Sequence, residues 1–201
     1  MARPPAIEVD TTFRLRLNLQ SVGLTGDQFD RLCSDNGDFQ IEMTADKQLI
    51  IMSPCCPETD RQNARITMRL GNWAEQDGTG VCFGPSACFT LANGAKRSPD
   101  AAWISKSRWN RLTREEKSTM TSICPDFVME LRSPSNRLLE LREKMEEYIA
   151  SGAKLGWLLD PIDNRATIYL PGQAPQVIAS PAIISGDPTL KGFQFDFREI
   201  L

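Results

Sequence analysis

The sequence SPDAAWIS at residues 98–105 and the sequence CPDFVMELRS at residues 124–133 decide the fold of this chain. In each stretch a proline and an aspartate precede a short apolar run, which covers residues 101–104 in the first and 127–131 in the second. Short continuous apolar runs bounded by turn residues are typical of strands that are buried on both faces. We therefore predict two central β-strands.

The segment that follows predicts a helix and a further strand. Apolar side chains over residues 138–150 recur at spacings of three and four and end before Gly152: Leu138, Leu141, Met145, Tyr148 and Ile149. This spacing indicates an amphipathic helix. Residues 155–159 form another buried apolar run, and residues 166–170 alternate as in an edge strand. The order strand, helix, strand predicts a mixed sheet with a helical crossover.

The N-terminal half predicts additions to this core. They are a strand over residues 13–19, a helix over 26–36 capped by Thr25, a hairpin of 39–43 and 48–52, and a long helix over 57–76. Ala64, Met68 and Trp73 mark the expected buried face of the long helix. The predicted fold is α/β, a mixed β-sheet flanked by α-helices, with residues 1–12 as a flexible terminus and 13–201 as one domain.

Composition limits the function classes. The chain has 201 residues, 41% hydrophobic and 24% charged, a net charge of −3 and no histidine. This excludes Ser-His-Asp and Cys-His catalysis and imidazole metal sites. No apolar run approaches the roughly 18 residues of a membrane span, and no secretory signal is present. The six cysteines form no CxxC pair, so we expect reduced thiols in a cytoplasmic protein without membrane attachment.

Glu130 is the most informative residue, because a carboxylate inside an apolar run is costly unless it is paired or binds a ligand. Asp126 lies on the same face of the strand but about 13 Å away, too far to share an ion. A partner must come from another strand, and Asp100 is the leading candidate. The alternatives are an ion pair between Glu130 and an arginine, and a turn-forming role for Asp100.

These stretches resemble a known family. RSPDAAWIS at 97–105 and PDFVMELRSPSNRLLELREKMEEYIASGAKLGWLLDP at 125–161, with FQIEMTADKQLIIMSP at 39–54 and ETDRQNARI at 58–66, are similar to the Uma-type endonucleases. That family lies within the PD-(D/E)XK restriction-endonuclease-like superfamily. The resemblance implies a mixed sheet flanked by helices, with a divalent metal held between an aspartate and a glutamate.

Carried over residue by residue, the resemblance implies that Asp100 and Glu130 are catalytic metal ligands and that Glu42 is a further acidic metal position. The superfamily's lysine position, two residues after Glu130, is Arg132 in this chain. The resemblance implies that a lysine on the next helix can supply the catalytic cation instead, and in this chain that residue is Lys144. Its position at the edge of the apolar stripe, with the side chain pointing toward the helix N-terminus, agrees with that role. An ordinary solvated lysine is the other interpretation of Lys144.

The predicted function is a Mg²⁺-dependent (or Mn²⁺-dependent) endonuclease that hydrolyses DNA. Its expected DNA-binding residues are Arg97 and a helical stripe of three arginines spaced by four: Arg61, Arg65 and Arg69. Two alternatives are a catalytically lapsed nuclease fold that binds nucleic acid or a protein, and an unrelated metal-dependent hydrolase of small phosphoesters. A two-fold homodimer is also expected, with the 166–170 edge and the phenylalanines of 193–197 as its apolar surface.

Overall fold

A six-stranded sheet forms the centre of the protein, with the strand order β11-β10-β9-β8-β7-β4. The structure is a computed structural model and describes residues 13–201. The flexible terminus predicted for residues 1–12 lies outside the described residues. The strands are β4 (Gly80–Phe83), β7 (Ala101–Ser105), β8 (Phe127–Leu131), β9 (Leu155–Asp160), β10 (Arg165–Tyr169) and β11 (Gln176–Ala179). The two predicted central strands, β7 and β8, are confirmed as antiparallel neighbours.

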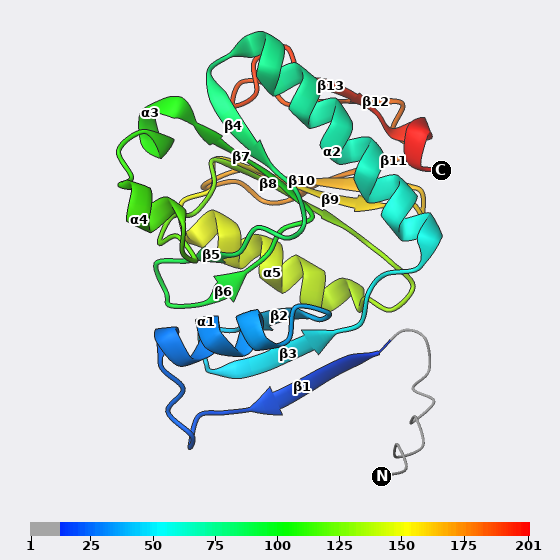
Figure 1. Ribbon diagram of the computed structural model, residues 1–201. Helices are drawn as coiled ribbons and strands as arrows, with labels where there is room; N and C mark the ends of the chain where they lie inside the picture. Colours follow the sequence, from blue (N-terminus) through cyan, green and yellow to red (C-terminus); the bar gives the residue numbers. More distant parts are fainter. Residues whose placement is uncertain (1–12) are drawn as a thin grey trace.

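Helix α5 (Leu138–Ala150) connects β8 to β9, which run parallel, so the predicted crossover is confirmed. One face of the sheet packs against α5, where Met145 and Tyr148 lie in a buried cluster with Val128 of β8. Helix α2 (Pro57–Asp77) covers the opposite face, where Leu70 joins a cluster with Met129. Successive strand residues point to opposite faces, so the sheet is buried between two helical layers (Figure 1).

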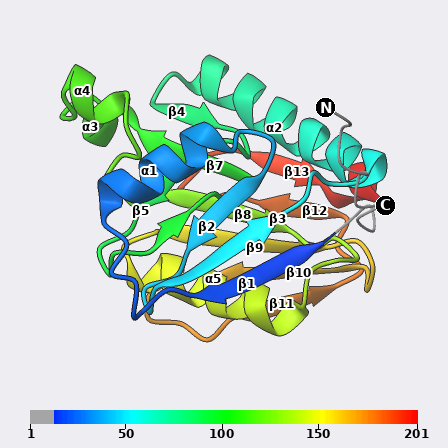
Figure 2. The ribbon, with the colours of Figure 1, turned by 60° about the horizontal axis from the view of Figure 1, so that its bottom comes forward.

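A second sheet, built mainly from the N-terminal residues, has the order β1-β3-β2-β6-β5. Figure 2 shows β1, β3 and β2 side by side in this sheet. Its strands are β1 (Arg14–Asn18), β2 (Gln40–Met43), β3 (Gln48–Met52), β5 (Phe89–Thr90) and β6 (Lys96–Arg97). Helix α1 (Gly26–Asp35) packs on this sheet through Phe29 and begins at a capping box of Thr25 and Gln28. The predicted strand, helix and hairpin of this region are confirmed.

The chain crosses between the two sheets just before β7. It leaves the central sheet after β4, contributes β5 and β6 to the N-terminal sheet, and returns to the central sheet at β7. Residues 98–100 therefore bridge the two sheets, with β6 paired to β2 on one side and β7 paired to β8 on the other. Two short surface helices, α3 (Lys106–Trp109) and α4 (Arg114–Lys117), follow β7.

The C-terminal segment packs on the α2 side of the central sheet. It consists of β12 (Ile183–Ser185), β13 (Gln194–Asp196) and a 3₁₀ helix, η1 (Phe197–Ile200). Its phenylalanines at 193, 195 and 197 belong to the largest buried cluster of the protein. The expectation that they form an exposed dimer surface was wrong, because the tail folds back and buries them within its own chain.

Two further predictions are corrected. Strand β10 is not an edge strand, because β11 pairs with it and places Ile178 opposite Ala166. The buried face of α2 is not that of Ala64 and Met68, which are exposed. Its buried residues are Thr59, Gln62, Asn63, Ile66, Leu70 and Ala74. The first three buried residues of this face, Thr59, Gln62 and Asn63, are polar. For this reason the spacing of apolar residues in the sequence indicated a different face of the helix.

Within residues 13–201, no helix has both the length and the apolar character needed to cross a membrane.

Candidate active site

Asp100 and Glu130 meet where β7 and β8 pair. The antiparallel register places Ala101 opposite Met129, so one step outward it places Asp100 opposite Glu130. Side chains on directly opposed residues of antiparallel strands have Cβ atoms about 4.5–5.5 Å apart. The backbone N–H of Leu131 also donates a hydrogen bond to Asp100 Oδ2 at 2.8 Å. The two acidic residues that the sequence analysis paired are therefore neighbours in the structure.

Glu42 reaches the same place from strand β2 of the N-terminal sheet. Its carboxylate is only 1% exposed and accepts a hydrogen bond from the Ser98 backbone N–H at 3.0 Å. Arg97 Nη1 lies 3.2 Å from Glu42 Oε2, and Arg97 Nε lies 2.6 Å from Glu147 Oε2 of α5. The pairing of β6 with β2 thus joins Glu42 to the segment that carries Asp100.

Lys144 of α5 lies between two carboxylates from different sheets. Its Nζ is 2.7 Å from Glu42 Oε1 and 2.8 Å from Glu130 Oε1, and it donates to the Ser98 carbonyl at 3.2 Å. The residue is 7% exposed. Helical geometry directs the side chain toward the start of α5, which follows β8 in the chain. This ammonium group is the cation nearest Glu130 in the described part of the chain.

The three carboxyl groups differ strongly in pKa. Burial would raise the pKa of Glu42, but Lys144 and Arg97 outweigh it and lower this pKa to about 2. Burial raises the pKa of Glu130 to about 8, with Lys144 opposing and Asp100 adding to the shift. Burial also raises the pKa of Asp100, against a lowering hydrogen bond from Leu131. Glu42 contacts two cations, Lys144 and Arg97, whereas Glu130 shares Lys144 with Glu42 and Asp100 forms no ion pair with a described residue.

Tyr148 is a site residue that the sequence analysis assigned only to the apolar stripe of α5. Its hydroxyl donates a hydrogen bond to Glu130 Oε1 at 3.2 Å, one helical turn beyond Lys144. Burial raises the pKa of Tyr148 well above its ordinary value, so the hydroxyl keeps its proton. The spacing of four residues from Lys144 was the available sequence signal, because such residues share one helix face.

Arg132 lies outside this group of contacts. Its Nη1 is 2.7 Å from Asp160 Oδ2 and 2.9 Å from Asp163 Oδ2, at the far end of β9. Strand β8 ends at Leu131, so the alternation that would place residues 130 and 132 on one face stops before Arg132. The structure thus brings Lys144, and not Arg132, into contact with Glu130.

Asn63 of α2 approaches Asp100 from the other side and was not singled out by the sequence. Its Nδ2 donates toward Asp100 Oδ1 at 3.5 Å, and the residue is 7% exposed. The Asn63 Oδ1 atom is buried and has no hydrogen-bond partner within the described residues. No sequence signal marked Asn63, because the expected buried face of α2 was that of Ala64 and Met68 and only the structure shows Asn63 to be buried.

The four arginines predicted to bind nucleic acid separate into two groups. Arg61, Arg65 and Arg69 lie along one exposed face of α2, where Arg61 pairs with Glu58 and the other two approach Glu199 of η1. Arg97, in contrast, is 7% exposed and belongs to the cluster around Glu42. The α2 stripe is therefore an exposed basic surface, whereas Arg97 is part of the site interior.

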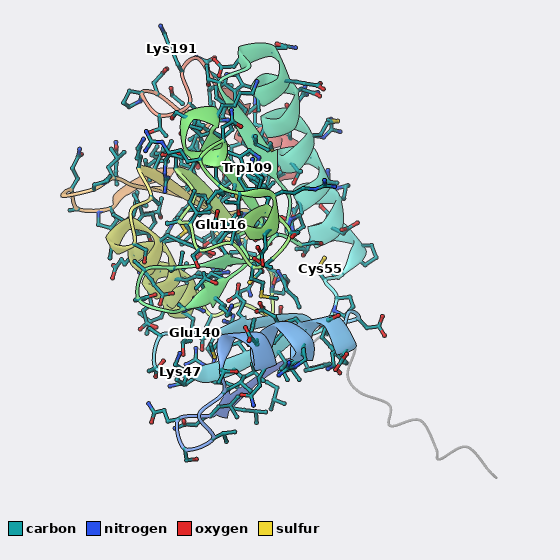
Figure 3. The ribbon with its side chains drawn as sticks, turned by 60° about the vertical axis from the view of Figure 1, so that its left-hand side comes forward. Lys47, Cys55, Trp109, Glu116, Glu140 and Lys191 are labelled. Atoms are coloured by element: carbon teal, nitrogen blue, oxygen red, sulfur yellow. The ribbon has the colours of Figure 1, made fainter. Side chains whose placement is uncertain are left out.

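A cleft of about 290 Å³ between the N-terminal sheet and α5 leads to the cations of the site. Its lining includes Arg97 and Lys144 of the site and also Arg14 and Glu140. Arg14 Nη2 lies 3.3 Å from Glu140 Oε2, and Figure 3 shows Glu140 at the level of the N-terminal sheet. Lys144 thus borders a cleft, although only 7% of the residue is exposed.

The donor atoms of the site fit a hard divalent cation. Asp100 and Glu130 are adjacent carboxylates, the ligand type that Mg²⁺ and Mn²⁺ prefer, and both lack a full complement of positive charge. Glu42 fits less well, because Lys144, Arg97 and Ser98 already satisfy it. Residues 13–201 contain no group of three or more acidic or cysteine side chains arranged for a metal ion. Water or substrate oxygens would thus complete any coordination shell.

Comparison with known proteins gives one family and one fold. The sequence model of the Uma2 family, described as "Putative restriction endonuclease", matches residues 27–198. The chain is also similar to the crystal structure of "a putative nuclease belonging to DUF820 from Anabaena variabilis ATCC 29413". The TM-score is 0.67 at 19% identity, over 80% of this chain and 88% of that chain. No curated protein matches the chain. The predicted restriction-endonuclease-like α/β fold is confirmed.

Proposed function

The chain belongs to the Uma2 family of putative restriction endonucleases, and we propose that it is an endonuclease that hydrolyses phosphodiester bonds in DNA with Mg²⁺ or Mn²⁺. The observation that carries the proposal is the convergence of Asp100, Glu130 and Lys144 at the junction of two sheets, where Lys144 Nζ lies 2.8 Å from Glu130 Oε1. Two under-neutralised carboxylates beside one ammonium group are suited to metal-assisted phosphodiester hydrolysis.

Asp100 and Glu130 would hold the cation. When bound, such a cation lowers the pKa of a water ligand and neutralises charge on the phosphate. The chain holds both carboxylates in place without it: the Leu131 N–H fixes Asp100, and the Tyr148 hydroxyl fixes Glu130. Fixed donors and acceptors need no rearrangement as the reaction proceeds, and this favours the transition state.

Lys144 is the proposed catalytic cation. Burial alone would lower the pKa of Lys144, but the carboxyl groups of Glu130 and Glu42 outweigh it and raise this pKa. Because the pKa of Glu42 is lowered to about 2, Glu42 stays charged beside Lys144, and the ammonium group keeps its proton. Lys144 therefore acts as a hydrogen-bond donor and a positive charge, which orients the attacking water and stabilises the pentavalent phosphate. Glu42, in this proposal, positions Lys144 rather than binding the metal, because its own contacts are satisfied.

The exposed stripe of Arg61, Arg65 and Arg69 on α2 is the proposed contact with the DNA backbone. These arginines are partly paired with glutamates, which a phosphate backbone would displace. With a net charge of −3, attraction to DNA has to come from such a local surface. We expect the protein to act in the cytoplasm, where its six free cysteines stay reduced.

A two-fold homodimer remains part of the proposal, because two active sites are needed to cut both strands at once. The surfaces first expected to form it are covered by β11 and by the protein's own core. The dimer would therefore use another surface.

A second candidate is a lapsed nuclease that binds nucleic acid without cleaving it. The observation in its favour is that Lys144 is already paired with both Glu42 and Glu130, as in a purely structural ion cluster. In that case the exposed arginines of α2 would still bind DNA.

Incubation of supercoiled plasmid with the protein and Mg²⁺ or Mn²⁺ separates the two candidates. Nicked or linear product that is absent with Glu130→Ala, and absent in EDTA, is the expected result. Plasmid binding by gel shift without any cleavage by the wild-type protein would support the lapsed nuclease instead.

A further inference from the structure

The amide oxygen of Asn63 is a buried hydrogen-bond acceptor without a partner. The side chain is more than nine-tenths buried, and its Oδ1 has no hydrogen bond with any described residue. A buried carbonyl oxygen has lost its water and gains nothing in return, so native proteins rarely leave one unpaired. Several buried side-chain atoms in residues 13–201 have no partner, and Asn63 is the one among these residues whose amide also faces Asp100, so a group bound at the site could satisfy it.

The orientation of this amide follows from its neighbour. Asn63 Nδ2 faces Asp100 Oδ1 at 3.5 Å. Turning the amide over would bring two acceptor oxygens together, which the Asp100 carboxylate disfavours. The donor end is therefore committed to Asp100, and the acceptor end is the free one.

The neighbouring amide on α2 shows how a satisfied side chain behaves on the same face. Gln62 is equally buried, and its Nε2 donates to the Ile200 carbonyl of η1 at 2.7 Å. Gln62 thus fastens α2 to the C-terminal segment, whereas Asn63 makes no such contact. Figure 3 shows Cys55, immediately before α2, near the junction with the N-terminal sheet, so this end of α2 lies close to the site.

We propose that Asn63 provides a further oxygen donor to the divalent cation held at Asp100 and Glu130, either directly or through one of the cation's waters. This inference rests on the proposed function, because it requires that cation. Amide oxygens are regular ligands of Mg²⁺ and similar hard cations.

The geometry is compatible with this role. The nitrogen and oxygen of a side-chain amide are about 2.2 Å apart, by analogy with peptide dimensions. Since Asn63 Nδ2 lies 3.5 Å from Asp100 Oδ1, the free oxygen lies within roughly 6 Å of that carboxylate oxygen. Two oxygens bound to one Mg²⁺ at 2.0–2.1 Å lie up to about 4.2 Å apart, and a bridging water extends this range.

Mn²⁺ binding measured by isothermal titration calorimetry tests the role through two substitutions that act in opposite directions. Asn63→Ala removes the oxygen, and the Mn²⁺ dissociation constant should rise about tenfold or more. Asn63→Asp places a charged oxygen where the neutral one was, and the dissociation constant should fall below that of the wild type. If Nδ2 merely orients Asp100, both variants lose that donor and both bind Mn²⁺ more weakly, which would overturn the inference.

Two variants on the same helical turn serve as controls. Gln62→Ala removes a buried amide that faces η1, and Ala64→Asp adds the same charge on the exposed face. Neither should change the Mn²⁺ dissociation constant by more than about twofold. An Ala64→Asp gain equal to that of Asn63→Asp would show a general charge effect and would also overturn the inference. Circular dichroism checks that each variant is folded.

The outcome for the wild-type protein keeps this inference separate from the proposed function. Failure of the wild type to bind Mn²⁺ would overturn both. Binding by the wild type that is lost in Asp100→Ala but unchanged in Asn63→Ala would overturn only the role of Asn63.

Discussion

Two segments of this protein share one local sequence and differ in chemistry. Ser98-Pro99-Asp100 and Cys124-Pro125-Asp126 each place an aspartate immediately before a central strand. Asp126 is fully buried, with Lys154 Nζ at 2.8 Å, Arg108 Nη1 at 3.1 Å and the Ser105 N–H at 2.9 Å. Asp100 accepts a hydrogen bond from the Leu131 N–H, faces the Asn63 amide at 3.5 Å and lies opposite Glu130.

The pKa values of the two aspartates consequently move in opposite directions. Burial would raise both. For Asp126 the hydrogen bonds and charges of Lys154, Ser105 and Arg108 outweigh burial and lower the pKa. For Asp100 burial outweighs the Leu131 hydrogen bond and the charge of Lys144, and the pKa rises. The same motif thus makes a structural anchor where two cations contact the aspartate, and leaves a carboxylate able to take up a cation where no described side chain forms an ion pair with it.

Replacing Asp100 should produce the largest effect. Asp100→Asn removes the charge that would hold the cation, so Mg²⁺-dependent cleavage should fall about 10³-fold, the upper range for loss of one electrostatic group. Stability should stay equal or rise slightly, because repulsion from Glu130 is relieved. Single-turnover cleavage and thermal unfolding in EDTA measure the two quantities. A marked loss of stability with cleavage retained would make Asp100 an anchor like Asp126.

The cation beside Asp100 and Glu130 is the next point to test. Lys144→Met should lower single-turnover cleavage about 10²-fold. Arg132→Met also replaces a cation with an uncharged side chain, but Arg132 pairs with Asp160 and Asp163. Arg132→Met should therefore lower single-turnover cleavage much less. Circular dichroism checks folding, with Lys144→Arg as a variant that keeps the charge. The reverse order of effects would assign the catalytic cation to Arg132.

Asp126→Asn makes the matched change in the other segment. It removes a fully buried charge from Lys154 and Arg108 but leaves an acceptor for Ser105, so the free energy of unfolding should fall by about 2 kcal/mol. Cleavage per folded molecule should not change. Urea unfolding followed by fluorescence measures the loss, and an unaltered midpoint would show that the ion pairs of Asp126 do not stabilise the fold.

The smallest effect should appear in the pH dependence of stability without metal. The lowered pKa of Asp126 gives stability that is present above its unfolded pKa, about 3.9, and is lost as pH falls through the folded pKa. The difference between wild type and Asp126→Asn should therefore shrink below about pH 4.

Asp100 should show the opposite sign, because its pKa is raised. The stability that Asp100 contributes decreases as pH rises from its pKa in the unfolded chain through its pKa in the folded protein. Asp100→Asn should therefore gain stability relative to the wild type as the pH approaches neutral. Thermal unfolding of the three proteins between pH 3 and pH 8 in EDTA compares the two segments directly. Parallel curves for both variants would contradict the difference between the aspartates.

The sequence by itself determined the central strands and the crossover helix, and it made Asp100 the leading candidate for the partner of Glu130. Apolar runs and three-four spacing are local properties, and β8 and α5 occur at the predicted residues. The cost of burying Glu130 within an apolar run required a partner, and the nearest Pro-Asp strand supplied it. These conclusions needed no knowledge of contacts between distant parts of the chain.

Only the tertiary structure decided which groups surround those carboxylates. Glu42 and Lys144 are 102 positions apart in sequence and meet because β2 and α5 pack at the junction of two sheets. The burial of Arg97, the separate pairing of Arg132 and the approach of Asn63 depend on the same packing. Local sequence specifies an element and its faces, but the partners of a buried charge come from segments far along the chain, so its pKa and its chemistry are tertiary properties.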